Sequence, residues 1–191
     1  MTTFATLSNG FGIGNPRHYR AAERALARAQ RKLARRTRRS RRRQKARAEL
    51  ARAHQHIANQ RRDFHHLVAR GLVDHFGRIA IEDLNVKGLA GSMLAKSVHD
   101  AGWSQFLAIL AAKAEEAGRT VIAVNAAGTT QRCSQCGEHV HKTLSQRWHT
   151  CPACGLSLGR DPNAARNVLL EAQRLGWSLQ APTVEVARAV A

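Results

Sequence analysis

The chain has four cysteines, which form two Cys-x-x-Cys pairs separated by fourteen residues: Cys133, Cys136, Cys151 and Cys154. A glycine follows each pair, which lets the backbone turn tightly and direct its amides toward the sulfur atoms. Two such pairs can bring four thiolates to the tetrahedral geometry that Zn²⁺ prefers. The spacing therefore predicts a structural zinc ribbon. The alternative is a pair of disulfides or four unrelated thiols.

Two carboxylates stand where an enzyme could use them. Glu82 ends the apolar run at residues 78–82, which predicts a buried strand, and open α/β sheets place their sites at the carboxyl ends of strands. Asp161 stands at the predicted start of a helix. Each has a simpler alternative, because Asp161 before a proline can be a helix N-cap and Glu82 can pair with an arginine. Asp83 is a weaker candidate, since strand periodicity points it away from Glu82.

Positive charge is concentrated in one part of the chain. The 191 residues include 31 Lys+Arg against 13 Asp+Glu, and the stretch from Arg28 to Arg47 has twelve basic residues and no acidic one. Such a run repels itself unless a polyanion is near, so nucleic acid is the predicted partner. The residues expected to contact phosphates are Arg35, Arg36, Arg38, Arg39, Arg41, Arg42, Arg43 and Lys45.

A membrane surface is the competing partner for this basic stretch. Its apolar residues are mostly alanine, however, and the larger ones form a narrow seam rather than a broad insertion face. No apolar run approaches membrane-spanning length, and the first residues do not resemble a signal peptide. We therefore expect a cytoplasmic, nucleoid-associated protein of prokaryotic type that does not bind membranes.

The basic stretch is predicted to form a helical hairpin over residues 16–71, after a short β-hairpin at residues 3–14. Asn15 and Pro16 are expected to be the N-cap and first residue of its first helix. Residues 37–40 form the bend. The second helix carries an alternating three-four seam of coiled-coil type: Ala46, Leu50, Ala53, Ile57, Gln60, Phe64 and Leu67.

The rest of the chain alternates between strands and helices. After the strand at residues 78–82, a loop is predicted at 85–96, then a helix that closes at Gly118 and a buried strand at 120–125. A last helix is predicted from about Pro162 to about Arg174. This order predicts a mixed α/β domain with a metal module inserted near its end.

Three tracts occur in a fixed order: Arg-Ile-Ala-Ile-Glu-Asp-Leu-Asn-Val-Lys-Gly at residues 78–88, Thr-Thr-Gln-Arg-Cys-Ser-Gln-Cys-Gly at 129–137 and Arg-Asp-Pro-Asn-Ala-Ala-Arg-Asn at 160–167. With the opening Phe-Ala-Thr-Leu-Ser-Asn-Gly at 4–10, they resemble the TnpB (OrfB-type accessory transposase) family of insertion sequences. The likeness extends from Phe4 to about Glu171.

This resemblance implies an RNase H-like (RuvC) nuclease that cleaves DNA with a guide RNA. Glu82 matches the family's second catalytic carboxylate and Asp161 its third, and the four cysteines match its zinc ribbon. Carboxylates that converge from a strand end and a helix start could hold Mg²⁺ ions, which activate water in phosphodiester cleavage. The arginine-rich hairpin would contact phosphates without reading sequence.

The resemblance also implies domain limits. We expect a partial RuvC-like domain at residues 1–127 that includes the inserted basic hairpin, a zinc ribbon at 128–158, a last RuvC-like segment at 159–175 and a tail at 176–191. The family's first catalytic aspartate lies in a strand that would fall upstream of Met1, and Gly159 stands where the family commonly has an aspartate. We therefore expect a truncated, cleavage-deficient member of the family.

Two other functions fit parts of the sequence. A non-catalytic zinc-ribbon protein that binds RNA or DNA would use the cysteines and arginines, while the carboxylates would only cap and pair. A ribosomal-type structural protein would explain the charge but not the contexts of Glu82 and Asp161.

Overall fold

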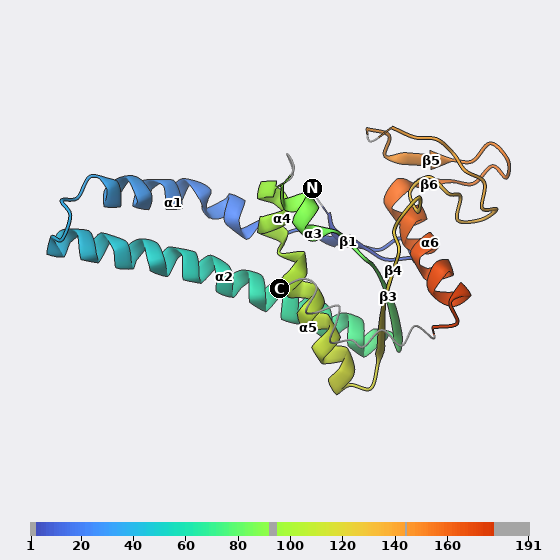
Figure 1. The fold of residues 1–191 in the computed structure, drawn as a ribbon, viewed down its shortest axis with the longest axis horizontal. Helices are drawn as coiled ribbons and strands as arrows, with labels where there is room; N and C mark the ends of the chain where they lie inside the picture. Colours follow the sequence, from blue (N-terminus) through green and yellow to red (C-terminus); the bar gives the residue numbers. More distant parts are fainter. Residues whose placement is uncertain (1–2, 92–94, 144, 178–191) are drawn as a thin grey trace.

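The computed structural model describes residues 3–91, 95–143 and 145–177 of the chain, and the predicted tail lies largely outside them. Two short strands come first and pair antiparallel as predicted, β1 (Thr3–Thr6) and β2 (Gly12–Gly14). The helical hairpin follows as α1 (His18–Ala34) and α2 (Arg41–His75). Figure 1 shows this hairpin extending away from the rest of the molecule.

The centre of the molecule is a parallel pair of strands, β3 (Arg78–Glu82) and β4 (Thr120–Val124). Three helices connect them: α3 (Val86–Ala90), α4 (Ala95–Ala101) and α5 (Trp103–Glu116). After β4 come the antiparallel pair β5 (Trp148–Thr150) and β6 (Ser157–Gly159), and then α6 (Arg160–Arg174). In Figure 1, α6 lies between the central strands and the β5–β6 module.

The predicted strands and long helices are confirmed, but the loop expected at residues 85–96 is wrong. It contains α3 and the first two residues of α4. Asn85 begins α3 by accepting a hydrogen bond from the Gly88 amide at 2.9 Å. The two glycines in this stretch suggested a loop, whereas Gly88 lies inside a helix of one turn and Gly91 ends it.

The coiled-coil seam of α2 is confirmed over its first half and at Phe64, which packs on the core, but not at Gln60 or Leu67. Ala46 and Ile57 are buried against α1, but Leu67 is 67% exposed. In the second half the buried positions are His65, Ala69 and Val73, which face α5. A straight helix drifts relative to a 3.5-residue repeat, and α2 changes its partner from α1 to α5 along its length. The buried face therefore moves around the helix.

An aromatic and apolar core joins the hairpin to the central strands. The Phe4 ring lies edge-on to Phe64 and to Phe106, with ring centroids 5.0 Å apart in both pairs. The Trp103 indole N–H donates to the Phe4 carbonyl at 3.1 Å. These contacts bring β1, α2 and α5 together and fix the base of the hairpin.

The start of α1 is stabilised by a residue distant in sequence. The helix begins at His18 with Arg17 at the N-cap, so the predicted Asn15–Pro16 start is wrong. Asn15 instead accepts from the Arg17 amide at 3.0 Å in a turn. The buried Asp100 of α4 accepts from the backbone amides of Tyr19 at 2.8 Å and Arg20 at 3.3 Å. A tertiary contact therefore replaces the local cap.

Among the described residues, no helix combines the length and the apolar character needed to cross a membrane.

Asp100→Ala is expected to lower the free energy of unfolding by about 1–2 kcal/mol, because two amides at the start of α1 lose their acceptor. The measurement is urea denaturation. His99→Ala changes an exposed neighbour on the same helix and is the control, with an expected change within about 0.5 kcal/mol. Equal losses in the two variants would contradict the capping role.

Candidate functional site

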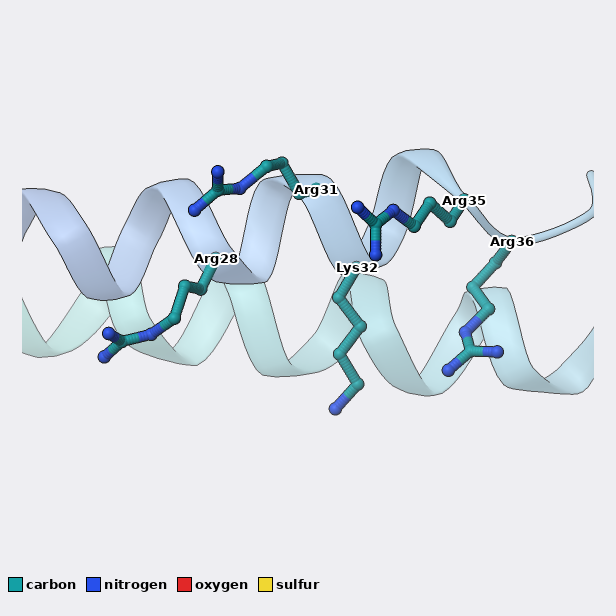
Figure 2. Close-up of a pocket in the computed structure, with 5 residues that line it drawn as sticks. All are labelled: Arg28, Arg31, Lys32, Arg35 and Arg36. Carbon is teal, nitrogen blue, oxygen red and sulfur yellow. The ribbon is translucent and has the colours of Figure 1, made fainter.

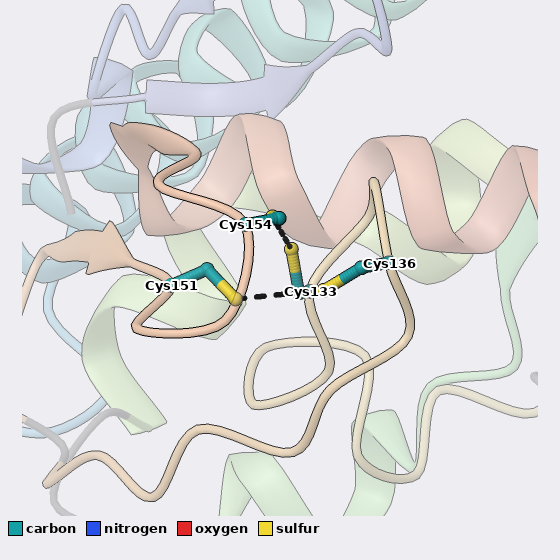
Figure 3. Close-up of side chains that lie close together, drawn as sticks. All are labelled: Cys133, Cys136, Cys151 and Cys154. Atoms are coloured by element: carbon teal, nitrogen blue, oxygen red, sulfur yellow. Dashed lines mark hydrogen bonds between the residues drawn. The ribbon is translucent and has the colours of Figure 1, made fainter.

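The four cysteine side chains converge from two loops, as Figure 3 shows. The sulfur atoms all lie within 4.8 Å of one another, with Cys133 and Cys154 Sγ 3.6 Å apart and Cys136 and Cys151 Sγ 3.5 Å apart. Four sulfurs placed about 2.3 Å from a tetrahedral metal would be about 3.8 Å apart. All four thiols are free, so the disulfide alternative is wrong. The arrangement matches a closed metal site.

The two cysteine loops have the same backbone hydrogen bonds. In the first loop the Cys133 amide donates to Glu138 O at 2.8 Å and the Gly137 amide to Cys133 O at 3.0 Å. In the second, the Cys151 amide donates to Leu156 O at 2.8 Å and the Gly155 amide to Cys151 O at 3.0 Å. Both glycines have positive φ, 81° and 74°, a conformation that strains other residues. The glycines predicted from the sequence therefore shape both loops.

The protein environment favours ionisation of one thiol in particular. Burial raises the pKa of Cys133, but the amides of Cys136 and Gln135 and the nearby His149 ring outweigh it and lower the pKa to about 6. The thiolate is the metal-binding form. Cys133 can therefore offer an ionised sulfur near neutral pH.

The three histidines of this module do not behave alike. His139 and His141 are exposed, whereas His149 is fully buried. The Lys142 amine donates to His149 Nδ1 at 2.5 Å, which leaves the ring hydrogen on Nε2. His149 thus packs inside the module beside Cys133.

Two buried asparagines of α6 bind the first cysteine loop, and sequence reasoning missed both. Asn163 and Asn167 donate through Nδ2 to the Arg132 carbonyl, each at 2.7 Å. Asn167 also donates to Thr129 O at 2.8 Å, and Asn163 Oδ1 accepts from the Ser134 amide at 3.0 Å. Their four-residue spacing on one helical face, among alanines and a valine, is the signal that could have identified them.

Glu82 and Asp161 approach each other from different elements. Glu82 is the last residue of β3, and Asp161 lies in the first turn of α6, which packs against β3 and β4. Burial raises the pKa of Glu82, and the charge of Asp161 raises it further. The structure therefore brings the two predicted carboxylates into electrostatic contact.

The simpler explanation of Asp161 as a helix cap is wrong. Helix α6 begins at Arg160 with Gly159 at the N-cap position, so Asp161 lies inside the first turn. Its side chain is 55% exposed, and Arg160 Nε lies 3.4 Å from Asp161 Oδ1. The Asp83 side chain is exposed, while its amide donates to Val124 O at 2.9 Å and extends the strand pairing. Asp161 and Asp83 are therefore exposed, whereas Glu82 is partly buried at the strand end.

The basic hairpin presents a cationic surface on α1 that extends beyond the predicted residues. Figure 2 shows five of its side chains, from the last turns of α1 and the two residues after it: Arg28, Arg31, Lys32, Arg35 and Arg36. All five are exposed, and they form two rows with four-residue spacing along α1. The predicted Arg38, Arg39, Arg41, Arg42 and Lys45 are also exposed, at the bend and the start of α2. Together these ten residues are the cationic surface of the hairpin.

Arg43 differs from the other predicted phosphate-contacting residues. Its Nη1 donates to the carbonyls of Leu33 and Arg36, both at 3.1 Å. These carbonyls lie at the end of α1, where helix acceptors lack intrahelical partners. Arg43 therefore joins the two helices at the bend, next to Ser40, whose hydroxyl accepts from the Arg43 amide and caps α2.

Two family models match the chain. OrfB_IS605, described as "Probable transposase", matches residues 1–93, and the "Cas12f1-like, TNB domain" model matches residues 103–168.

Two relatives extend over most of the chain. A Streptomyces pristinaespiralis protein named "Putative RNA-guided DNA endonuclease" is 37% identical over 172 residues, which are 88% of this chain and 42% of the relative. InsQ of Escherichia coli (strain K12), of the same description, is 36% identical over 186 residues, with 88% of this chain and 46% of the relative covered. The chain thus spans less than half the length of these relatives.

A solved structure has the same fold over most of the chain. It is the cryo-EM structure of a Cas12f1–sgRNA–target DNA complex, with a TM-score of 0.58, 17% identity, and coverage of 83% of this chain and 43% of that one. The order of motifs, the two family models and these relatives agree. The chain belongs to the TnpB (OrfB-type) family of insertion-sequence proteins.

Proposed function

We propose that the chain provides the carboxylate and zinc-ribbon part of an RNA-guided DNA endonuclease of insertion-sequence origin, with DNA and a guide RNA as partners. The observation that carries this proposal is the convergence of Glu82 and Asp161 from β3 and α6, next to the cysteine loops. The names of the relatives and the nucleic acids in the Cas12f1 complex support it. In this account the α/β core is RNase H-like and the α1–α2 hairpin is an insertion in it.

The four cysteines fit a structural Zn²⁺ ion. An all-sulfur tetrahedral set leaves no open position, so the ion would stabilise the fold and would not act on substrate. The cysteine module has few regular elements, because β5 and β6 have three residues each. Small modules of this kind depend on their metal for folding.

Purified protein is expected to contain one zinc per chain, measured by elemental analysis. Cys151→Ser should remove the metal and lower the thermal unfolding temperature, whereas His139→Ala, at an exposed histidine of the same module, should change neither. Protein without zinc, or a Cys151→Ser variant with unchanged zinc, would contradict the assignment.

Glu82 and Asp161 fit a Mg²⁺ ion by their chemistry. Both offer carboxylate oxygens, the donors that Mg²⁺ prefers. Burial and then the charge of Asp161 raise the pKa of Glu82, and a bound cation would offset the repulsion between the two carboxylates. Bound Mg²⁺ would lower the pKa of a water and stabilise charge at a phosphodiester. The exposed Asp161 would bind the cation from the solvent side, while Glu82 would hold it from the strand end.

At this site the described residues provide two carboxylates, Glu82 and Asp161. Within the described ranges, the four cysteines are the one group of three or more metal-ligating side chains. Two carboxylates bind Mg²⁺ weakly, because the ion keeps most of its waters. We therefore propose that the 191-residue chain cleaves DNA slowly by itself. This observation also favours the second candidate function, a non-catalytic zinc-ribbon protein that binds RNA or DNA.

Thermal unfolding across pH, with and without MgCl₂, distinguishes these two functions. The pKa of Glu82 is higher in the folded protein than in the unfolded chain, so its ionised form destabilises the fold. This destabilisation disappears as the pH falls through the raised pKa toward 4.5. Without Mg²⁺, Glu82→Gln should therefore raise the unfolding temperature at pH 7 and weaken this pH dependence.

With Mg²⁺, the parent protein should be stabilised, and Glu82→Gln and Asp161→Asn should each abolish that stabilisation. Asp83→Asn, at the exposed neighbouring carboxylate, is the control and should retain it. Stabilisation by Mg²⁺ that persists in Asp161→Asn would exclude the proposed metal site and leave the non-catalytic function.

The cationic surface of the hairpin is proposed to bind nucleic-acid phosphates. Its ten residues are exposed on a chain with a formal charge of +18, and charge contacts of this kind carry no base information. Lys32 also pairs with Glu49 across the two helices at 2.5 Å, with both side chains about half exposed. Such a pair contributes little to stability, so phosphate can compete for Lys32.

Affinity for nucleic acid should fall with salt, with a log–log slope of about −0.7 to −0.9 per phosphate contact. Replacing Arg31, Arg35, Arg38 and Arg39 by alanine should flatten this slope, as measured by fluorescence anisotropy. Arg43→Ala should instead lower the unfolding temperature and leave the slope nearly unchanged, because Arg43 binds main-chain carbonyls. A slope unchanged in the fourfold variant would exclude this surface as the binding site.

A further inference from the structure

Trp148 is a large aromatic residue on the surface of the cysteine module. It is 62% exposed, although tryptophan is usually well buried. Its indole N–H donates to Ser157 Oγ at 2.8 Å. This hydrogen bond satisfies the indole N–H and fixes the orientation of the ring. Much of the indole remains open to solvent.

The strand pairing places Trp148 beside the first turn of α6. Trp148 in β5 stands directly opposite Gly159 in β6, and opposite residues of an antiparallel pair project from the same face. A Cβ at Gly159 would lie 3.1 Å from Pro162 Cδ, so Pro162 lies on that face. Pro162 follows Asp161 in sequence. The exposed indole and the turn that carries Asp161 therefore share one side of the β5–β6 pair.

Two arginines adjoin one end of the β5–β6 pair. Arg147 is exposed and precedes Trp148, and its carbonyl accepts from the Arg160 amide at 2.8 Å. The Arg160 guanidinium donates to Gln146 O at 3.3 Å and lies 3.4 Å from Asp161 Oδ1. The Arg160 side chain is only 14% exposed, so Arg147 is the cation that this surface offers to solvent. An exposed aromatic face next to an exposed cation fits a polyanion whose units carry flat rings.

We propose that Trp148 is a stacking platform for an unpaired base of single-stranded DNA that passes the Asp161 end of α6. The exposed Arg147, next to Trp148 in sequence, would meet a phosphate of the same strand. Stacking on an aromatic face tolerates any base, but it requires a base that is not paired and stacked within a duplex. The platform would hold an unpaired strand beside Asp161. This inference rests on the proposed function, because it assumes that DNA reaches Glu82 and Asp161.

The test compares binding of oligothymidylate and of a mixed-sequence duplex to the zinc-loaded 191-residue chain. Trp148→Leu keeps an apolar side chain without the aromatic face and should weaken oligothymidylate binding about tenfold. Trp148→Phe keeps an aromatic face and should remain within about twofold of the parent, and duplex binding should be unchanged in both. Phe11→Leu is the matched control, at a 64% exposed aromatic residue near β2.

A second measurement leaves Trp148 intact. The chain has three tryptophans, so Trp103→Phe with Trp177→Phe makes Trp148 the one source of indole fluorescence. Oligothymidylate should quench this emission, and the duplex should quench it less. This fluorescence measurement tests the stacking platform even if Trp148→Leu loses its zinc and fails to fold.

Three results would overturn the stacking platform: oligothymidylate affinity unchanged in Trp148→Leu, equal weakening in Phe11→Leu, or no quenching of Trp148. If the parent chain binds duplex with the predicted salt dependence while one of these results is found, the inference fails and the proposed function stands. If the parent chain binds neither nucleic acid, both fail.

Discussion

Two asparagines of α6 make buried contacts with the first cysteine loop. These contacts fix the position of the cysteine module relative to the carboxylates. Asn163 and Asn167 bind the same carbonyl of Arg132, and both are almost fully buried. Buried amides of this kind are costly to leave unpaired, so the loop and the helix are strongly coupled. The same helix carries Asp161 in its first turn and packs through Val168 against Val124 and Ile122 of β4. A metal that orders the cysteine loops would therefore also order Asp161 relative to Glu82.

The charge of the chain imposes a second constraint. Cations on α1 and at the bend repel one another, and the hairpin is held together by a narrow apolar seam and a few polar contacts at its ends. Arg43 binds the end of α1 and Asp100 binds its start, so both ends of the helix are fixed by residues from other elements. The apolar side of α1 faces α2, and this leaves the cationic surface free to meet a polyanion. Figure 1 shows the hairpin and the cysteine module at opposite ends of the molecule, with the central strands between them.

Sequence reasoning succeeded where the signal is local. The Cys-x-x-Cys spacing predicted the converging thiols, and the apolar runs predicted β3 and β4. It failed where the determinant is a tertiary partner. Nothing near His18 indicates that Asp100 caps α1, and nothing near His149 indicates that Lys142 binds its ring in the interior. The change of partner along α2 likewise exposes Leu67, which the repeat alone would bury.

The central claim is that Glu82 and Asp161 form one divalent-cation site. The most direct measurement replaces Mg²⁺ by Mn²⁺ and records amide NMR signals of the ¹⁵N-labelled 191-residue chain, because paramagnetic Mn²⁺ broadens signals close to it. The account predicts selective loss of the Glu82 and Asp161 signals at low Mn²⁺, with no such loss in Asp161→Asn. Broadening confined to the exposed Glu115 and Glu116 at the end of α5, with the Glu82 and Asp161 signals intact, would contradict it.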